Sequence, residues 1–214
     1  MRRTFACLAA AVLAVLMTSA RADIILTASL THDQETGAPG LTPTTTSTGA
    51  PRPLSFGTAT FTLNDAQTAL TMTATIFNID VTGTQTSDTF DNLVAAHIHA
   101  PAPAGSNAGV RWGFFGTPDN DNNPDNLIVT PFASGVGGTF TSVWDQPEGN
   151  AGTNLTTNLP FILAGLSYIN FHTVQFGGGE IRGQILQVPE PASIALLALA
   201  LAGLGFSRRK VAAR

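Results

Sequence analysis

The 214-residue sequence is poor in cysteine and in positive charge. Its one cysteine, Cys7, lies in an apolar N-terminal segment, so the rest of the chain has no disulfide framework. Between residues 23 and 187 the basic residues are Arg52, Arg111 and Arg182, with no lysine, and thirteen acidic residues oppose them to give a net charge of −10. This charge excludes nucleic-acid binding through phosphate contacts, and we expect no nucleic-acid partner.

The N-terminus has the pattern of a secretory signal peptide. Two arginines precede an apolar run from Phe5 to Met17, and Ala20-Arg-Ala22 follows as a small-x-small site. We predict cleavage between Ala22 and Asp23, which makes residues 1–22 the signal peptide. The alternative, a membrane anchor, is disfavoured because the apolar run is too short to cross a bilayer.

The C-terminal segment, residues 188–214, combines a proline-rich linker, an apolar run and a basic end. The linker contains Pro189, Glu190 and Pro191. An uncharged run extends from Ala192 to Phe206, and the basic residues begin at Arg208. Its 15 residues would form about 22 Å of helix at roughly 1.5 Å per residue, short of the hydrocarbon core unless flanking residues help. The basic end favours a cytoplasmic location. We therefore predict an apolar helix that holds the exported protein at the inner membrane.

Outside the two ends the chain lacks a sustained helical periodicity. Residues 23–187 suit one domain and are rich in threonine, glycine, asparagine and β-branched residues. Alternation of apolar and polar residues, bounded by turn signals, predicts strands at 24–30, 55–63, 69–77, 93–99, 110–115, 127–132, 138–143, 168–174 and 180–186. Short strands of this kind predict an all-β, antiparallel β-sandwich or barrel.

Local signals refine this prediction. Phe56 is out of phase with the alternation that follows it, so Gly57 is expected to mark a β-bulge. Residues 64–67 are predicted to be a hairpin turn, and 36–53 a long loop. Residues 159–166 are predicted to be a short helix or a loop.

Three of the four histidines fall in two predicted strands. His97 and His99 are two residues apart, so both point to the face opposite Ile98. In the later strand His172 similarly lies opposite the face that carries Phe171. A third polar set, Glu180 with Arg182 and Gln184, shares one face near the end of the domain; it either pairs with neighbouring loops or is solvated.

These segments resemble the CHRD domain, first described in chordin and found in bacterial exported proteins. The resemblance rests on His97-Ile-His-Ala-Pro-Ala102, Tyr168-Ile-Asn-Phe-His-Thr173 and Gly178-Gly-Glu-Ile-Arg-Gly-Gln184, and it spans residues 24–187. Ala100 departs from the family pattern, which usually has glycine there. The resemblance implies an immunoglobulin-like β architecture and no established enzymatic activity, so we expect residues 23–187 to be a CHRD-like domain and not an enzyme.

The C-terminal segment resembles the PEP-CTERM sorting signal of Gram-negative bacteria. The resemblance rests on Pro189-Glu-Pro191, the apolar run and the basic end. It implies handling by an exosortase, transient anchoring at the inner membrane and a final place at the cell surface or in the exopolysaccharide matrix. The alternative is a permanent single-span anchor.

The histidines leave three interpretations open: a bound metal ion, metal-dependent catalysis on such an ion, and a purely structural role. If their strands are neighbours in one sheet, His97, His99 and His172 converge and form a site for copper or zinc, since neutral imidazole is a common ligand of both metals. A fourth ligand is not evident, unless His32 or an aspartate supplies it. Otherwise the histidines hydrogen-bond to loops and fix the register of the sheet. The Asp- and Asn-rich stretch at 117–125 is a weaker candidate for calcium, because it lacks the Gly and Glu of an EF-hand loop.

The sequence thus predicts an exported surface or matrix protein with a structural or binding role and an unidentified surface or matrix ligand. It predicts no cofactor beyond the candidate copper or zinc ion. The alternative function is an envelope protein that binds copper or zinc through its clustered histidines.

Overall fold

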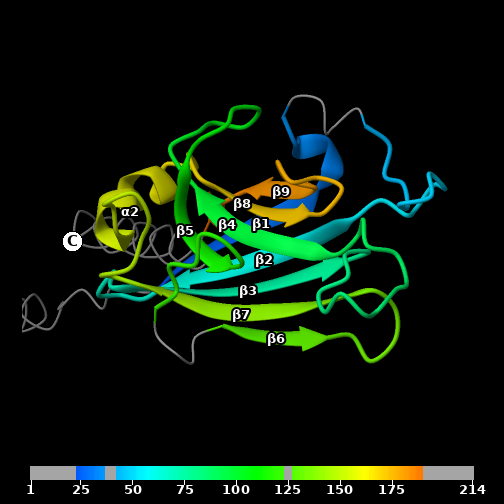
Figure 1. Cartoon of the computed structure of the whole chain (residues 1–214). Coiled ribbons are helices and arrows are strands. Elements are labelled where there is room, and N and C mark those ends of the chain that lie inside the picture. The colour runs from blue at the N-terminus through cyan, green and yellow to red at the C-terminus, as the bar shows by residue number, and fades with distance from the viewer. Residues whose placement is uncertain (1–22, 37–41, 123–126, 190–214) are drawn as a thin grey trace, which may run out of the picture.

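The computed structural model describes residues 23–36, 42–122 and 127–189 (Figure 1). The strands are β1 (Ile24–Thr31), β2 (Phe56–Leu63), β3 (Ala69–Phe77), β4 (Leu93–His99), β5 (Val110–Phe115), β6 (Ile128–Pro131), β7 (Gly137–Asp145), β8 (Tyr168–Thr173), β9 (Ile181–Gln184) and β10 (Leu186–Gln187). A 3-10 helix, η1 (His32–Gln34), follows β1, and an α-helix, α2 (Leu155–Leu163), precedes β8.

The predicted signal peptide at 1–22 and the predicted apolar helix lie outside the described residues. Of the predicted cleavage and sorting residues, Asp23 and Pro189 are described, whereas Ala22, Glu190 and Pro191 are not. In the ranges that are described, no helix has the length and apolar character needed to cross a membrane. The structure therefore tests neither the signal peptide nor the apolar helix, and both stay predictions from the sequence.

The ten strands form one antiparallel sheet that curls into a half-barrel (Figure 1). Its order is β5-β4-β8-β9-β1-β2-β3-β7-β6, and β10 pairs with β1. Although β5 and β7 lie near opposite ends of this order, Trp112 on β5 stacks on Trp144 of β7 with ring centroids 5.5 Å apart. The prediction of an all-β antiparallel fold is confirmed, and the curled sheet is consistent with the sandwich or barrel class.

The core occupies the concave side of the curl, because the strands alternate. On β2, Phe61 and Leu63 are fully buried while Thr58 and Thr60, which precede them on the other face, are exposed, and β3 repeats this alternation in register. Strands with such alternation bury one face and expose the other. The largest fully buried apolar side chains are Trp112, Trp144, Phe61, Phe114, Phe140, Phe171, Leu26, Leu30, Leu63, Leu70 and Met72.

The predicted bulge at Gly57 is wrong. Gly57 pairs in continuous register with Leu30 on β1 and Ile76 on β3. Phe56 is out of phase because it lies on the outer face, 49% exposed, where it stacks on Phe77 with centroids 4.7 Å apart. An apolar residue on the outer face, rather than an extra residue in the strand, broke the alternation.

Two further elements differ from prediction in their bounds. The short helix predicted at 159–166 is α2, which begins at Leu155 because the side chain of Asn154 accepts a hydrogen bond from the backbone N–H of Thr157 and caps the helix. The strand predicted at 180–186 is divided into β9 and β10, and β10 pairs with β1. The hairpin turn predicted at 64–67 is confirmed by the bond from the Gln67 N–H to the Asn64 carbonyl.

A buried ion pair ties the long loop before β2 to the sheet. Arg52 donates to both carboxylate oxygens of Glu180, at 2.7 and 2.5 Å, and their side chains are 6% and 0% exposed. Ser55 and Thr173 donate to the same carboxylate, so both of its oxygens are saturated. Such saturation is what makes a buried charge pair tolerable. Glu180 is therefore paired rather than solvated.

Candidate metal centre

The register of β4 against β8 brings the three predicted histidines together. Ala95 pairs with His172, and His97 pairs with Asn170, so His172 is the diagonal neighbour of His97. His97 and His99 lie two residues apart on the same face of β4. One candidate ligand atom from each histidine lies within 4.8 Å of the other two. The condition stated for convergence, that the two strands are neighbours in one sheet, is met.

The histidines are buried although they lie on the outer face of the sheet. His97, His99 and His172 are 5%, 7% and 7% exposed. Loops cover them, and the cover over His97 depends on Gly113, its partner on β5. A Cβ atom at Gly113 would lie 1.8 Å from the carbonyl oxygen of Pro118 and 3.1 Å from Cδ2 of His97. Glycine is therefore required for the loop to lie against the histidine.

Each histidine has one ring nitrogen held by a backbone carbonyl. His97 Nε2 is 3.1 Å from the Thr117 carbonyl oxygen, His99 Nδ1 is 3.0 Å from that of Ala108, and His172 Nδ1 is 3.1 Å from that of Gly177. Carbonyl oxygens only accept hydrogen bonds, so each of these nitrogens carries a proton. In neutral imidazole the other nitrogen then carries a lone pair.

The contact between the His97 and His172 rings lacks a proton to form a hydrogen bond. His97 Nδ1 lies 3.2 Å from His172 Nε2, and both nitrogens are the ones left unprotonated by the carbonyl contacts. Two neutral imidazoles supply two protons, and the chain of three contacts needs three. Two lone pairs therefore face each other unless a third proton or a cation joins them.

The third lone pair is on His99 Nε2. This atom is buried, and it makes no hydrogen bond with the residues that the structure describes. A buried polar atom without a partner is costly and is rare in folded proteins. The unpaired His99 Nε2 and the unprotonated pair His97 Nδ1 and His172 Nε2 are three ring nitrogens with lone pairs in one small region.

The environment disfavours an extra proton on these rings. Burial, and then the neighbouring His172, lowers the pKa of His97 to about 4. Burial likewise lowers the pKa of His99 to about 4, and it lowers the pKa of His172. These lowered pKa values favour uncharged rings at neutral pH, so the three converging lone pairs are available to a metal ion.

The geometry suits a small first-row metal ion. Bonds of about 2.0–2.1 Å to imidazole nitrogen in a tetrahedral zinc site place two ligand nitrogens about 3.3 Å apart. The observed distance between His97 Nδ1 and His172 Nε2 is 3.2 Å. With a metal ion bound, the carbonyls on the remote nitrogens would be the outer hydrogen-bond partners that orient the three histidines. Three neutral nitrogen ligands leave a fourth position for water or another ligand.

Residues that the sequence did not assign to the candidate metal site surround the cluster. Tyr168 stacks on His99, with centroids 4.7 Å apart and an interplanar angle of 2°, and the guanidinium of Arg182 lies over the Tyr168 ring, 4.2 Å from its centroid. Arg182 is 2% exposed and also bonds to Asn107, so it anchors the 100–109 loop rather than facing solvent. Glu35, also buried, is close enough to Arg182 to feel its charge.

Two other candidate ligands are placed elsewhere or not described. His32 lies outside the cluster, because its Nδ1 is 2.7 Å from the Glu180 carbonyl oxygen and its Nε2 is 3.2 Å from that of Thr42. The calcium candidate at 117–125 lies partly outside the described residues, which omit 123–126. In its described part, Asp121 accepts a hydrogen bond from Ser142. Among the described residues, the group with metal-binding geometry is the three histidines alone.

An outward-facing histidine cluster on a curled antiparallel sheet defines a β-domain with a candidate metal site. The chain belongs to the CHRD domain family, whose domain is matched over residues 26–185. The PEP-CTERM protein-sorting motif is matched over residues 187–210, which implies recognition by exosortase-type machinery and export to the surface or the extracellular space. Both resemblances noted from the sequence are confirmed. No curated protein matches the chain. No solved structure matches it either.

The lowered pKa values of the histidines predict a pH-dependent stability for the metal-free protein. In the unfolded chain these histidines have the ordinary pKa of 6.5, whereas in the folded protein the pKa values of His97 and His99 are about 4. Their contribution to stability is therefore complete above pH 6.5 and is lost as the pH falls to 4. Glu35, whose pKa burial raises to about 7, acts in the opposite direction, losing its contribution as the pH rises from 4.5 to 7.

To separate these effects, urea unfolding in a chelator at pH 7, 5.5 and 4.5 compares wild type with His97→Asn. The difference in unfolding free energy between the two proteins should shrink toward pH 4.5, because the variant lacks one depressed histidine. A difference that stays constant with pH would contradict the burial of an uncharged ring at this position.

The close approach at Gly113 predicts that Gly113→Ala disturbs the centre. The added methyl must displace the Pro118 carbonyl, and with it the neighbouring Thr117 carbonyl that holds His97. Loss of such an outer partner costs about 10- to 100-fold in metal affinity. Zinc titration by calorimetry should show this loss, while Gly109→Ala, where a Cβ meets nothing within 4 Å, should bind as wild type does. Equal affinities for both variants would refute the positioning role of the loop.

Proposed function

We propose that this chain is an exported CHRD-domain protein that binds one copper or zinc ion through His97, His99 and His172. The observation that carries the proposal is the convergence of three ring nitrogens whose lone pairs have no proton to share. Each opposite nitrogen is held by a carbonyl, so the rings are oriented before the metal arrives. This is the alternative function that the sequence left open. In this proposal the histidines bind a metal ion and also help to hold the neighbouring loops in place.

The choice of copper or zinc follows from the donor set. Imidazole nitrogens favour zinc, copper and related first-row metals, whereas calcium and magnesium prefer oxygen ligands. No carboxylate joins the cluster among the residues that the structure describes. We propose a binding role rather than an enzymatic one, in a protein of Gram-negative origin that exosortase-type machinery sorts. Transient anchoring by the C-terminal apolar helix belongs to the same proposal.

A second candidate function is the binding of a surface or matrix molecule, as the sequence predicted. The observation that favours it is an exposed pair of stacked aromatic rings, Phe56 and Phe77, on the outer face of the sheet. Large apolar side chains gathered on a surface commonly mark a contact with another molecule. This role uses a different part of the domain and is compatible with metal binding.

Metal content tests the principal proposal. The tag-free protein, incubated with Cu²⁺ or Zn²⁺ and then dialysed, should retain close to one equivalent by elemental analysis. His97→Ala should reduce retention below a tenth of an equivalent, because it removes one of three ligands. His32→Gln is the matched control, since His32 is equally buried but lies outside the cluster, and it should retain the ion. A wild-type protein that retains neither metal, or equal retention by His97→Ala, would overturn the proposal.

A further inference from the structure

The outer face of the strands β1, β2, β3 and β7 is an uncovered array of threonine side chains. Registered pairs align Thr27, Thr60, Thr73 and Thr141 in one row across the four strands. A second row aligns Ser29, Thr58, Thr75, Thr139 and, on β6, Thr130. The residues between them along each strand are buried in the core, so the hydroxyls of both rows face outward.

This array offers regularly spaced hydrogen-bonding groups. Neighbouring strands are about 4.8 Å apart, and outward residues repeat about every 6.7 Å along a strand. Thr58, Thr60 and Thr73 are exposed, and among the described residues their hydroxyls make no hydrogen bond to the protein. Thr75 and Thr139 in the second row bond to each other, at 3.2 Å, and the hydroxyls of Thr58, Thr60 and Thr73 remain available to a ligand with repeating hydroxyl groups.

An aromatic row borders the array at one end of the strands. Phe56 and Phe77 are paired across β2 and β3, and their rings stack with centroids 4.7 Å apart. Phe132 extends the row, with its ring 5.0 Å from that of Phe77. Phe56 is 49% exposed and Phe77 is 36% exposed. We call Phe56, Phe77 and Phe132 the aromatic ladder.

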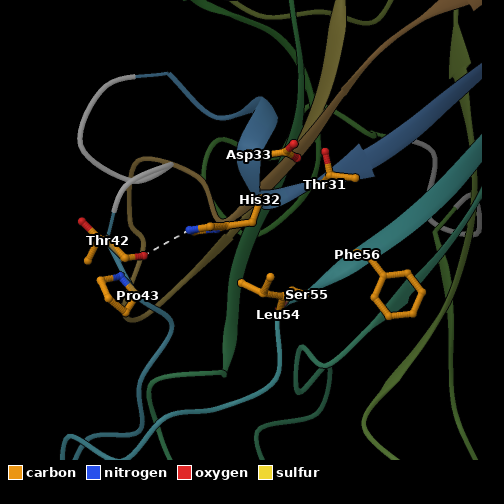
Figure 2. A pocket seen from close by; sticks show the side chains of 8 residues that line it. All are labelled: Thr31, His32, Asp33, Thr42, Pro43, Leu54, Ser55 and Phe56. Carbon is orange, nitrogen blue, oxygen red and sulfur yellow. Dashed lines mark hydrogen bonds between the residues drawn. The ribbon is translucent and has the colours of Figure 1, made fainter.

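A pocket of about 500 Å³ opens beside the ladder (Figure 2). Phe56, Leu54 and Pro43 form its apolar wall, and Thr31 and Asp33 contribute polar groups. Leu54 is 62% exposed, so this wall adds to the apolar surface of the ladder. The volume lies in the range of pockets that hold small organic ligands.

The negative charge of the domain limits which ligands can bind this face. The rows and the ladder contain no charged side chain, and the domain as a whole carries a net charge of −10. An anionic polymer would be repelled by this field. A ligand with many hydroxyls, apolar ring faces and no charge fits the hydroxyl rows, the aromatic ladder and the Asp33 carboxylate at once.

We propose that this face binds a neutral polysaccharide, with sugar ring faces on the aromatic ladder and sugar hydroxyls on the threonine rows. This rests on the second candidate function above and gives its ligand a chemical class. It does not depend on the histidine cluster, which lies on β4 and β8. One sugar unit occupies the pocket beside Phe56, where Asp33 and Thr31 accept hydrogen bonds from its hydroxyls.

Affinity electrophoresis of the full, tag-free protein tests the proposal with three neutral probes, a mixed-linkage β-glucan, dextran and a galactomannan, and one anionic probe, alginate. At least one neutral probe should retard the wild-type protein, and alginate should not. Phe56→Ser and Thr60→Lys should each weaken that retardation at least 10-fold. Both positions are on the outer face, so the variants should retain the wild-type circular dichroism and thermal transition.

Two controls separate this proposal from the metal site and from general surface effects. Thr156→Lys places the same charge on the exposed side of α2 and should leave retardation unchanged. His97→Ala should also leave it unchanged, so loss of metal and loss of polysaccharide binding are distinguishable.

Three results would overturn the proposal. In the first, none of the three neutral probes retards the wild-type protein. In the second, alginate alone retards it. The third is a dimer of the wild-type protein that Phe56→Ser converts to a monomer without any polysaccharide binding, because the ladder would then be an interface between two copies of the chain.

Discussion

The pairing of β4 with β8 is the constraint on which the candidate metal centre depends. Because Ala95 faces His172 and His97 faces Asn170, the diagonal between the two strands places two imidazoles in contact. A slip of one residue would move every side chain of one strand to the other face of the sheet. The core fixes that register, since Ile98 and Phe171 must both point inward for the sheet to close over Trp112 and Trp144.

The two faces of the sheet differ in composition and in role. The concave face is apolar and tightly packed, and it holds the curl through aromatic contacts such as that between Phe140 and Phe171, 5.4 Å apart. The outer face changes character along the sheet: over β4, β8 and β9 it is polar and covered by loops, and over β2, β3 and β7 it is open and rich in threonine. The covered part holds the histidines, and the open part presents hydroxyls and aromatic rings to solvent.

Much of this architecture could be predicted from the sequence, because alternation determines both strands and faces. The bounds predicted for β3, β4 and β5 agree with the structure, and the common face of His97 and His99 followed from their spacing. The orientation of the histidines could not be predicted, since the carbonyls of Thr117, Ala108 and Gly177 that hold them carry no signature in the sequence. The same holds for the partnership of Arg52 and Glu180, which lie 128 residues apart. The error at Gly57 arose because an exposed phenylalanine looks like a core residue out of phase.

The central claim is that three neutral histidines point their lone pairs at one another in the metal-free protein. Long-range proton–nitrogen correlation NMR of the nitrogen-15-labelled protein at pH 7, in the presence of a chelator, reports directly which ring nitrogen carries each proton. The account predicts the proton on Nε2 of His97 and on Nδ1 of both His99 and His172. A proton on Nδ1 of His97, or a doubly protonated ring in the cluster, would mean that a proton already joins the rings and would contradict the account.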